Sequence, residues 1–286
     1  MNRFNMKVTD YQPYYKATPQ SLGNEDLNRL ITYFELLDDV QKPVVSLVTP
    51  VYRAKATLVA HILSLSNLKT IIPYEVIFVE NNADEETLSI LEQLGAKVVS
   101  EPRQGITYAR QKGLEEAKGQ IICTMDPDSI YDPYYIDKMA LPFFVDKDLV
   151  LCYSVSQSYE DDFQLSPKMR LRNKLKLAYF RWKLSQKFTT KIKHIRAVSM
   201  AMRRETLLPI GYDTDLRVVS GCDDGMLAIH LHNLGTFKYV NVEVFTALPP
   251  EREPGKPFPF CNERFRVPKK ALEATMEALE ISKVPH

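Results

Sequence analysis

The chain contains few glycines, only 10 among 286 residues. A dinucleotide-binding fold needs a glycine-rich turn after its first strand, where the backbone approaches a pyrophosphate. Residues 50–55, which follow the first expected strand, contain no glycine, and no segment matches the phosphate-binding pattern GxxxxGK[ST]. The sequence therefore argues against NAD or FAD binding and against an ATPase of the P-loop class. We expect a cation, instead of a glycine-rich backbone, to contact any bound phosphates.

Cysteines and long apolar runs are also scarce. The 4 cysteines are widely spaced and form no CxxC pair, which argues against a zinc site or a disulfide framework and favours a reducing compartment. No apolar run reaches the roughly 18 residues of a membrane span, and residues 1–7 contain no apolar core of a signal peptide. We therefore expect a cytoplasmic protein, either soluble or attached peripherally to the cytoplasmic membrane face.

Acidic residues are missing from one long segment. Residues 163–204 contain 13 of the 37 Lys and Arg residues and none of the 36 Asp and Glu residues. The net charge of +1 therefore hides a mildly acidic body with one strongly basic segment, and this distribution points to a binding surface.

The apolar pattern divides residues 43–130 into alternating strands and helices. Strands are expected at 44–49, 75–79, 97–99 and from 120, and helices at 56–68, 85–94 and 104–118. Strands that alternate with helices of this length are typical of βαβ units and a parallel sheet. The sequence predicts an α/β fold with a Rossmann-like mixed sheet flanked by helices, in which residues 43–130 form the nucleotide-binding half.

The remaining segments are expected to complete one continuous domain. Residues 1–42 would form an extended arm and a helix at 24–40, and residues 249–286 a loop and a C-terminal helix. Residues 131–248 would form an acceptor-side half, for which we expect a basic helix at 165–190, strands at 148–156, 195–203 and 237–245, and a helix at 223–234.

Two carboxylates, Asp126 and Asp128, follow the strand that begins at Gln120 and are separated by Pro127. The carboxyl ends of parallel strands border the crevice in which such folds bind ligands. Carboxylate oxygens suit Mg²⁺ or Mn²⁺, and these ions in turn bind phosphates. Asp and Pro are also common in turns, so the motif alone is weak evidence for a metal site and favours a plain turn.

Six sequence blocks follow one another along the chain: an opening strand at 45–52, an acidic turn at 79–84, a Gly-Ala-Arg helix at 104–113, a DxD block at 125–128, an Arg-Arg-Glu strand end at 201–205 and an acidic pair on a helix at 223–235. These blocks, in this order, resemble those of the family 2 glycosyltransferases, which have the GT-A fold. The resemblance covers roughly residues 43–245. It implies an inverting enzyme that uses a nucleotide-diphosphate sugar, here a UDP-sugar.

The resemblance also implies a donor site. The implied donor-binding residues are Pro50, Tyr52, Glu80, Asp84, Arg110 and Asp126. Glu80 would contact the nucleobase, Asp84 would shape its pocket, and Arg110 would support the site from its helix. Asp126 would contact the ribose or the water shell of the metal, and Asp128 would bind a Mn²⁺ or Mg²⁺ ion that bridges the diphosphate. Residues 233–285 contain no histidine, so the third metal ligand found in some relatives is not assigned.

The acidic pair Asp223-Asp224 is the candidate catalytic group. Sugar transfer needs a carboxylate that takes the proton from an acceptor hydroxyl and a cation that neutralises the leaving diphosphate. The resemblance makes Asp224 the general base, with Asp223 beside it. The alternative is that both residues only cap a helix N-terminus. The chain departs from many relatives in having Asp223 in place of Glu and His230 in place of Arg.

The basic segment is the candidate acceptor or surface-binding element. Its key residues are Arg172, Lys176, Arg181, Trp182 and Lys183. Helical spacing makes the segment amphipathic, so it could lie on an anionic membrane or hold a polyprenyl-phosphate-linked acceptor. Cations interleaved with aromatics also suit nucleic acid, and a solvated helix is the third alternative.

The resemblance, together with these residues, implies an inverting, metal-assisted transferase that moves a sugar to a hydroxyl of a glycan or a lipid-linked acceptor. Two alternatives stay open. One is a glycosyltransferase that acts on modified nucleic acid. The other is a non-catalytic module that binds nucleotide sugars or nucleic acid.

Overall fold

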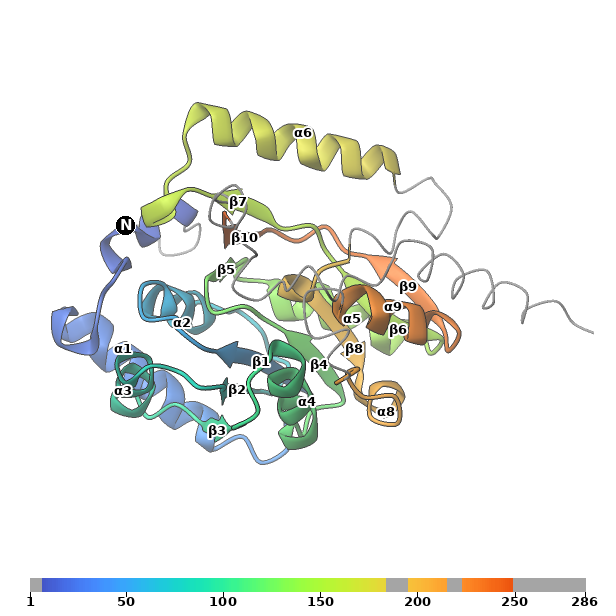
Figure 1. Cartoon of the computed structure of the whole chain (residues 1–286), viewed down its shortest axis with the longest axis horizontal. Helices are drawn as coiled ribbons and strands as arrows, with labels where there is room; N and C mark the ends of the chain where they lie inside the picture. The colour runs from blue at the N-terminus through green and yellow to red at the C-terminus, as the bar shows by residue number, and fades with distance from the viewer. Residues whose placement is uncertain (1–6, 184–194, 215–222, 249–286) are drawn as a thin grey trace, which may run out of the picture.

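The computed structural model describes residues 7–183, 195–214 and 223–248. Its main sheet has seven strands in the order β3-β2-β1-β4-β8-β6-β9 (Figure 1). In that order the strands are Val98–Ser100, Tyr74–Glu80, Val45–Val51, Ile121–Thr124, Met200–Arg203, Leu149–Tyr153 and Thr236–Tyr239. Strand β8 runs antiparallel to its neighbours β4 and β6, whereas the other pairs are parallel. The predicted mixed sheet is therefore confirmed.

Strand β1 lies inside the sheet and is mostly apolar, since both of its faces are covered. All seven of its residues are buried. Leu47 belongs to the apolar core on one face of the sheet, and the adjacent Val48 belongs to the core on the other face. Alternate residues of a strand point to opposite faces, so a strand covered on both sides has a continuous apolar sequence.

Helices form a layer on each face of the sheet. The core on the Leu47 side includes residues of α1 (Asn24–Asp38), α2 (Leu58–Ser66), α3 (Glu85–Gln93) and α5 (Tyr135–Val145). The core on the Val48 side includes residues of α4 (Ile106–Glu116), α8 (Arg204–Leu207) and α9 (Asp223–His232). Cys123 on β4 and Cys152 on β6 are buried free thiols in the core on the Leu47 side.

A second sheet of three strands lies beside the first. Its order is β5-β10-β7, with β5 at Ser129–Tyr131, β10 at Val244–Ala247 and β7 at Gln157–Tyr159. The basic segment begins as a single long helix, α6 (Pro167–Lys183), which lies along β7 at the outer edge of the molecule (Figure 1). This helix confirms the described part of the predicted basic helix.

Three sequence predictions about elements are wrong. The single strand expected at 237–245 is two strands, because the chain leaves the edge of β6 after Tyr239 and enters the second sheet as β10. The expected extended arm contains the 3₁₀ helices η1 (Val8–Tyr14) and η2 (Pro19–Ser21), and Tyr11 is buried in the core. Pro50 does not end β1, because the Val51 carbonyl still accepts a hydrogen bond from the Asn81 amide.

Some predictions concern residues that the structure does not describe. The loop and helix expected at 249–286 and residues 184–190 of the basic helix lie outside the described ranges. Within those ranges, no helix combines the length and apolar character that crossing a bilayer requires.

Candidate active site

A cavity of about 440 Å³ opens at the carboxyl ends of β1, β2 and β4. The chain runs outward from β1 to β2 and β3 and then returns to β4 on the other side of β1, so the strand order reverses at this point. Such reversals create a crevice in open α/β sheets. The lining residues are Pro50, Val51, Tyr52, Arg53, Ala54, Thr57, Asn81, Gln104, Gly105, Ile106, Ala109, Arg110, Asp126, Pro127 and Asp128.

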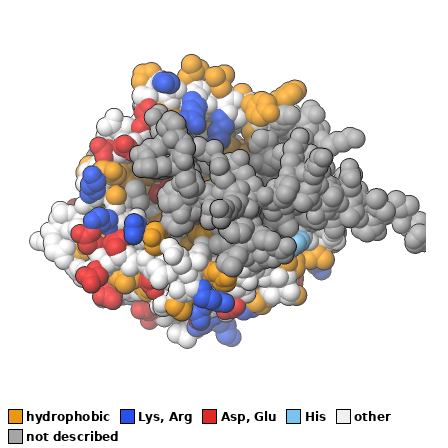
Figure 2. Space-filling view, in the orientation of Figure 1, with side chains coloured by type: hydrophobic (Ala, Val, Ile, Leu, Met, Phe, Trp, Pro, Cys, Tyr) orange, Lys and Arg blue, Asp and Glu red, His pale blue; other side chains and the backbone are white. Residues whose placement is uncertain are grey.

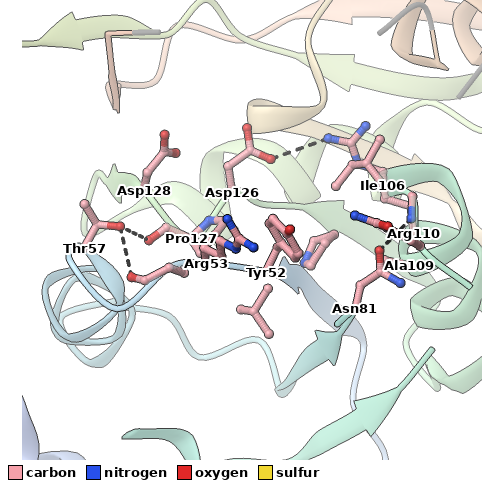
Figure 3. Close-up of a pocket in the computed structure, with 15 residues that line it drawn as sticks. Tyr52, Arg53, Thr57, Asn81, Ile106, Ala109, Arg110, Asp126, Pro127 and Asp128 are labelled. Atoms are coloured by element: carbon pink, nitrogen blue, oxygen red, sulfur yellow. Dashed lines mark hydrogen bonds and ion pairs between the residues drawn. The ribbon is translucent and has the colours of Figure 1, made fainter. Parts of the chain in front are cut away.

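The Asp-Pro-Asp turn is held in place by hydrogen bonds through its backbone. The Asp126 amide donates to the Tyr131 hydroxyl at 3.1 Å, and the Thr57 hydroxyl donates to the Pro127 carbonyl at 3.0 Å. The Tyr159 hydroxyl donates to the Asp128 carbonyl at 2.6 Å. Because the backbone makes these bonds, both carboxylates can project to the same side of the turn (Figure 3).

The carboxylate of Asp128 lies in a polar but confined setting. The hydroxyls of Ser129 and Thr246 donate to its Oδ1 atom at 3.1 and 3.2 Å. Burial raises the pKa of the Asp128 carboxyl above its usual range, because the charged form loses hydration, although these hydrogen bonds oppose the shift. A cation beside the carboxylate would compensate for that lost hydration.

The carboxylate ligands available at this turn suit a hard divalent cation that is bound together with a substrate. Asp126 and Asp128 supply carboxylate oxygens from one turn, and no group of three or more His, Cys, Asp or Glu side chains suited to a metal occurs among the described residues. Mg²⁺ is typically held by one or two carboxylates while water and substrate phosphates complete its shell. Two carboxylates at the mouth of a cavity match this arrangement.

Arg110 joins two carboxylates that lie far apart in the sequence. This arginine belongs to α4 and is nearly buried, and its Nη1 atom lies 3.1 Å from Oδ1 of Asp224. Its Nη2 atom lies 3.5 Å from Oδ1 of Asp126 (Figure 3). The structure thus brings together a predicted nucleotide-site arginine, the DxD block and the candidate base.

Backbone geometry places the helix that carries Arg110. Gly105 precedes α4 with φ 147°, a conformation that side chains with a Cβ atom disfavour. Further along α4, a Cβ atom on Gly113 would lie 2.2 Å from Cγ1 of Val48. The two glycines therefore allow α4 to start at the cavity and to pack closely on β1.

Asp224 lies at the start of α9 with its side chain 18% exposed. Its carboxylate is paired with the Arg110 guanidinium. Asp223 is the first residue of α9. The structure describes its backbone but not its side chain, so the role predicted for it beside Asp224 stays a prediction.

Glu80, predicted to contact the nucleobase, and Asp84, predicted to shape its pocket, do not line the cavity. Glu80 accepts hydrogen bonds from the Ala83 amide and the Ser100 hydroxyl, and Asp84 caps α3 by accepting from the Thr87 amide. Both side chains thus shape the loop after β2, and a contact with the base stays a prediction.

Sequence reasoning missed Asn81, the residue directly after β2. Its amide nitrogen donates to the carbonyls of Glu101 and Arg103 at 2.7 Å each, and its Oδ1 atom accepts from the Gly105 amide at 2.8 Å. Asn81 therefore ties the end of β2 to the loop that starts α4. Its place after a buried strand was the available signal.

Arg53 was also missed. Its guanidinium lies 5.1 Å from the centroid of the Tyr52 ring, and both residues line the cavity. Arg53 lies in the glycine-free turn, so it supplies a cation where a dinucleotide fold would use bare backbone.

The predicted surface-binding residues form a separate region on α6 and do not line the cavity. Arg172 is exposed and Trp182 is 61% exposed. Lys176 instead directs its ammonium inward, where it donates to the Ser156 carbonyl. For Arg181 and Lys183 the structure describes their position in α6 but not their side chains.

Comparison with known proteins identifies the family to which the chain belongs. The sequence profile described as Glycosyl transferase family 2 matches residues 46–209, more than half of the chain. EpsH of Bacillus subtilis, named as a glycosyltransferase, is 29% identical over 127 residues, which is 43% of this chain and 36% of EpsH. Hyaluronan synthase of Pasteurella multocida is 25% identical over 128 residues, 43% of this chain and 13% of the synthase. The chain thus matches about a third or less of the length of these relatives.

Solved structures share the fold at low sequence identity. GalNAc-T7 in complex with UDP, GalNAc and Mn²⁺ has a TM-score of 0.54 at 16% identity, covering 74% of this chain and 45% of its own. The mannosyltransferase PcManGT of Pyrobaculum calidifontis, in complex with GDP-Man and Mn²⁺, has a TM-score of 0.54 at 17% identity, covering 86% of this chain and 70% of its own. The chain belongs to glycosyl transferase family 2, a family of enzymes, and has the α/β architecture of GT-A glycosyltransferases.

Proposed function

We propose that the protein transfers a sugar from a nucleotide-diphosphate donor, a UDP-sugar, to an acceptor hydroxyl with inversion at the anomeric carbon. The observation that carries this proposal is the Arg110 contact with both Asp126 and Asp224. It links a carboxylate of the strand-end turn to a carboxylate suited to proton transfer. Solved structures of the same fold were determined with UDP and Mn²⁺ or with GDP-Man and Mn²⁺, which supports a nucleotide sugar as the donor.

In this proposal the Asp-Pro-Asp turn holds the diphosphate end of the donor. Asp128 is the main ligand of Mn²⁺ or Mg²⁺, and Asp126 contacts the ribose or the water shell of that ion. The cation would neutralise the charge that develops on the departing diphosphate. Arg53 and Tyr52 border the same cavity and would contact the donor there. Pro50, Glu80 and Asp84 would define the nucleotide end of the site.

Asp224 would act as the general base. Its carboxylate takes the proton from the acceptor hydroxyl while the hydroxyl oxygen attacks the anomeric carbon. The diphosphate leaves from the opposite face of that carbon, so the configuration is inverted. Arg110 holds the Asp224 carboxylate in place before the reaction. The acceptor would be a glycan or a polyprenyl-phosphate-linked sugar.

A thermal-shift panel tests the donor assignment. The protein is heated with a set of UDP-, GDP- and other nucleotide sugars, each with and without Mn²⁺. We expect one nucleotide class to raise the melting temperature, and the increase to be larger with Mn²⁺. The Asp128→Asn variant should lose the Mn²⁺-dependent part of the increase. If no nucleotide sugar stabilises the wild-type protein, the proposed donor class is wrong.

A further inference from the structure

Helix α6 is fixed to the molecule along one face. Met169, Asn173 and Phe180 lie on this face and are each only 3–4% exposed. The Asn173 amide group exchanges two hydrogen bonds with the Ser158 backbone on β7, at 2.9 and 2.8 Å. The Ser166 hydroxyl accepts from the Met169 amide at the start of the helix. The helix is therefore a firmly attached element with a defined outer face.

The outer face of α6 carries an exposed apolar stripe. Leu171 is 58% exposed, Leu175 is 62% exposed and Trp182 is 61% exposed. Residues spaced by four and seven positions share one side of a helix, and this side lies opposite Asn173. In Figure 2 hydrophobic side chains gather along the upper edge of the molecule, where Figure 1 places α6. Large aliphatic side chains exposed along a helix indicate an interaction surface.

Basic residues flank the apolar stripe on both sides. At 100° per residue, Lys168 and Arg172 fall on one side of Leu171 and Leu175, and Lys174 falls on the other. All three basic residues are exposed. The helix contains no Asp or Glu, so its outer surface has positive charge alone. An exposed aliphatic stripe bordered by cations is complementary to an anionic surface with an apolar interior.

We propose that α6 docks the protein on the surface of an anionic lipid bilayer. The helix has 17 residues and would lie flat in the interface over about 25 Å. Leu171, Leu175 and Trp182 would enter the boundary between headgroups and acyl chains, while the flanking cations contact anionic headgroups. Nucleic acid would use the cations but not the aliphatic stripe. The proposal does not depend on the donor or on the catalytic step.

Sedimentation of the full chain with lipid vesicles tests this surface. Vesicles of phosphatidylcholine alone are compared with vesicles that also contain phosphatidylglycerol, at low and high salt. We expect binding to the anionic vesicles only, and release at high salt. Arg172→Gln with Lys174→Gln should weaken binding about 25-fold, about fivefold for each cation removed. Leu171→Ser with Leu175→Ser should weaken it at least about tenfold.

Matched variants control for unspecific loss of charge or apolar surface. Leu36 lies on α1 and is 63% exposed, so Leu36→Ser removes a similar side chain away from α6. Lys42 and Lys147 are exposed, and Lys42→Gln with Lys147→Gln removes two charges elsewhere. Both controls should bind vesicles like the wild type. Circular dichroism and melting curves should show that every variant is folded.

Three results would overturn the proposal. The first is no binding to phosphatidylglycerol vesicles by the folded wild-type chain. The second is vesicle binding that the α6 variants leave unchanged. The third is binding to single-stranded or duplex DNA without binding to vesicles, which would assign the basic surface to nucleic acid.

Discussion

Arg110 is the residue on which the site's electrostatics depend. It is nearly buried, and its guanidinium contacts carboxylates of β4's turn and of α9. Two carboxylates close together repel one another unless a cation lies between them. Arg110 supplies that cation from within the chain.

Asp224→Asn separates a catalytic role from a binding role. An amide oxygen can still accept a hydrogen bond from Arg110, but the amide group does not take a proton from the acceptor. We expect transfer to fall by about 10²- to 10⁴-fold, while stabilisation by the donor is retained. Product formation and thermal shift on the same variant measure the two effects. Asp39→Asn, at an exposed position, is the control. Equal activity of Asp224→Asn and wild type would assign the base elsewhere.

His61 gives a pH dependence to stability. It is fully buried, its Nδ1 atom donates to the Ser129 carbonyl at 2.8 Å, and its Nε2 atom lies 3.3 Å from the Thr49 hydroxyl. Burial lowers the pKa of His61 to about 4, because the charged imidazolium would lose its hydration, whereas the backbone hydrogen bond to Ser129 opposes this shift.

Acid should lower the free energy of unfolding through His61. Between pH 6.5 and about 4 the unfolded chain binds more protons at this residue than the folded chain, so acid favours unfolding. This residue alone should lower the free energy of unfolding by about 3 kcal/mol over that interval. Urea unfolding near neutral pH and near about pH 4.5 should show a smaller difference for His61→Gln than for wild type. Equal differences would contradict the assignment.

At the scale of elements, α4 is placed by its close approach to β1. A Cβ atom at position 113 would lie 2.2 Å from Cγ1 of Val48 and 3.2 Å from Cγ2 of Val79. Gly113→Ala should therefore push α4 outward and lower the free energy of unfolding by about 1–3 kcal/mol. Gly23→Ala is the control, since nothing lies within 4 Å of its added Cβ atom. Urea denaturation measures both, and equal midpoints would show that α4 can adjust.

Strands β1, β2 and β4 were predictable because they are largely buried and therefore rich in apolar residues. The helices between them were predictable from their apolar spacing. The small sheet was not, since β5 and β7 have three residues each, too few to show a period. The strand predicted over 237–245 is two strands in the structure, because the alternating pattern of these residues does not show that the chain changes sheet after Tyr239.

The site was predictable where its residues carry charge in a characteristic spacing. The structure brings Asp126, Arg110 and Asp224 together, and the catalytic and donor-binding roles that the resemblance implied for them stay predictions. Asn81 was missed because its side chain acts through hydrogen bonds to the backbone of another loop, at Glu101 and Gly105. That role depends on which loops are adjacent, and no local pattern records it.

At the scale of the whole molecule, the metal should affect donor binding more than folding. Among the described residues no cluster of three or more side chains could hold a cation alone, and Arg110 already offsets the charge of two carboxylates. We expect a chelator to leave the melting temperature of the free protein unchanged. In the presence of donor at about 100 times its dissociation constant, the chelator should remove much of a stabilisation of about 2.7 kcal/mol.

Calorimetry of the free and donor-bound protein, with and without chelator, measures these effects. Addition of Mg²⁺ after chelation controls for damage to the protein. A large loss of stability in the free protein would instead indicate a metal that is part of the fold.

Strand β7 connects helix α6 to the candidate active site. Ser158 is bonded on both its backbone groups to Asn173 of α6, and the next residue, Tyr159, bonds the carbonyl of Asp128. The helix therefore cannot rotate or slide on the body without breaking the bonds that fix this strand. A protein held to a flat surface by α6 would present its cavity at one constant height and angle, and only acceptors of the corresponding reach could be modified.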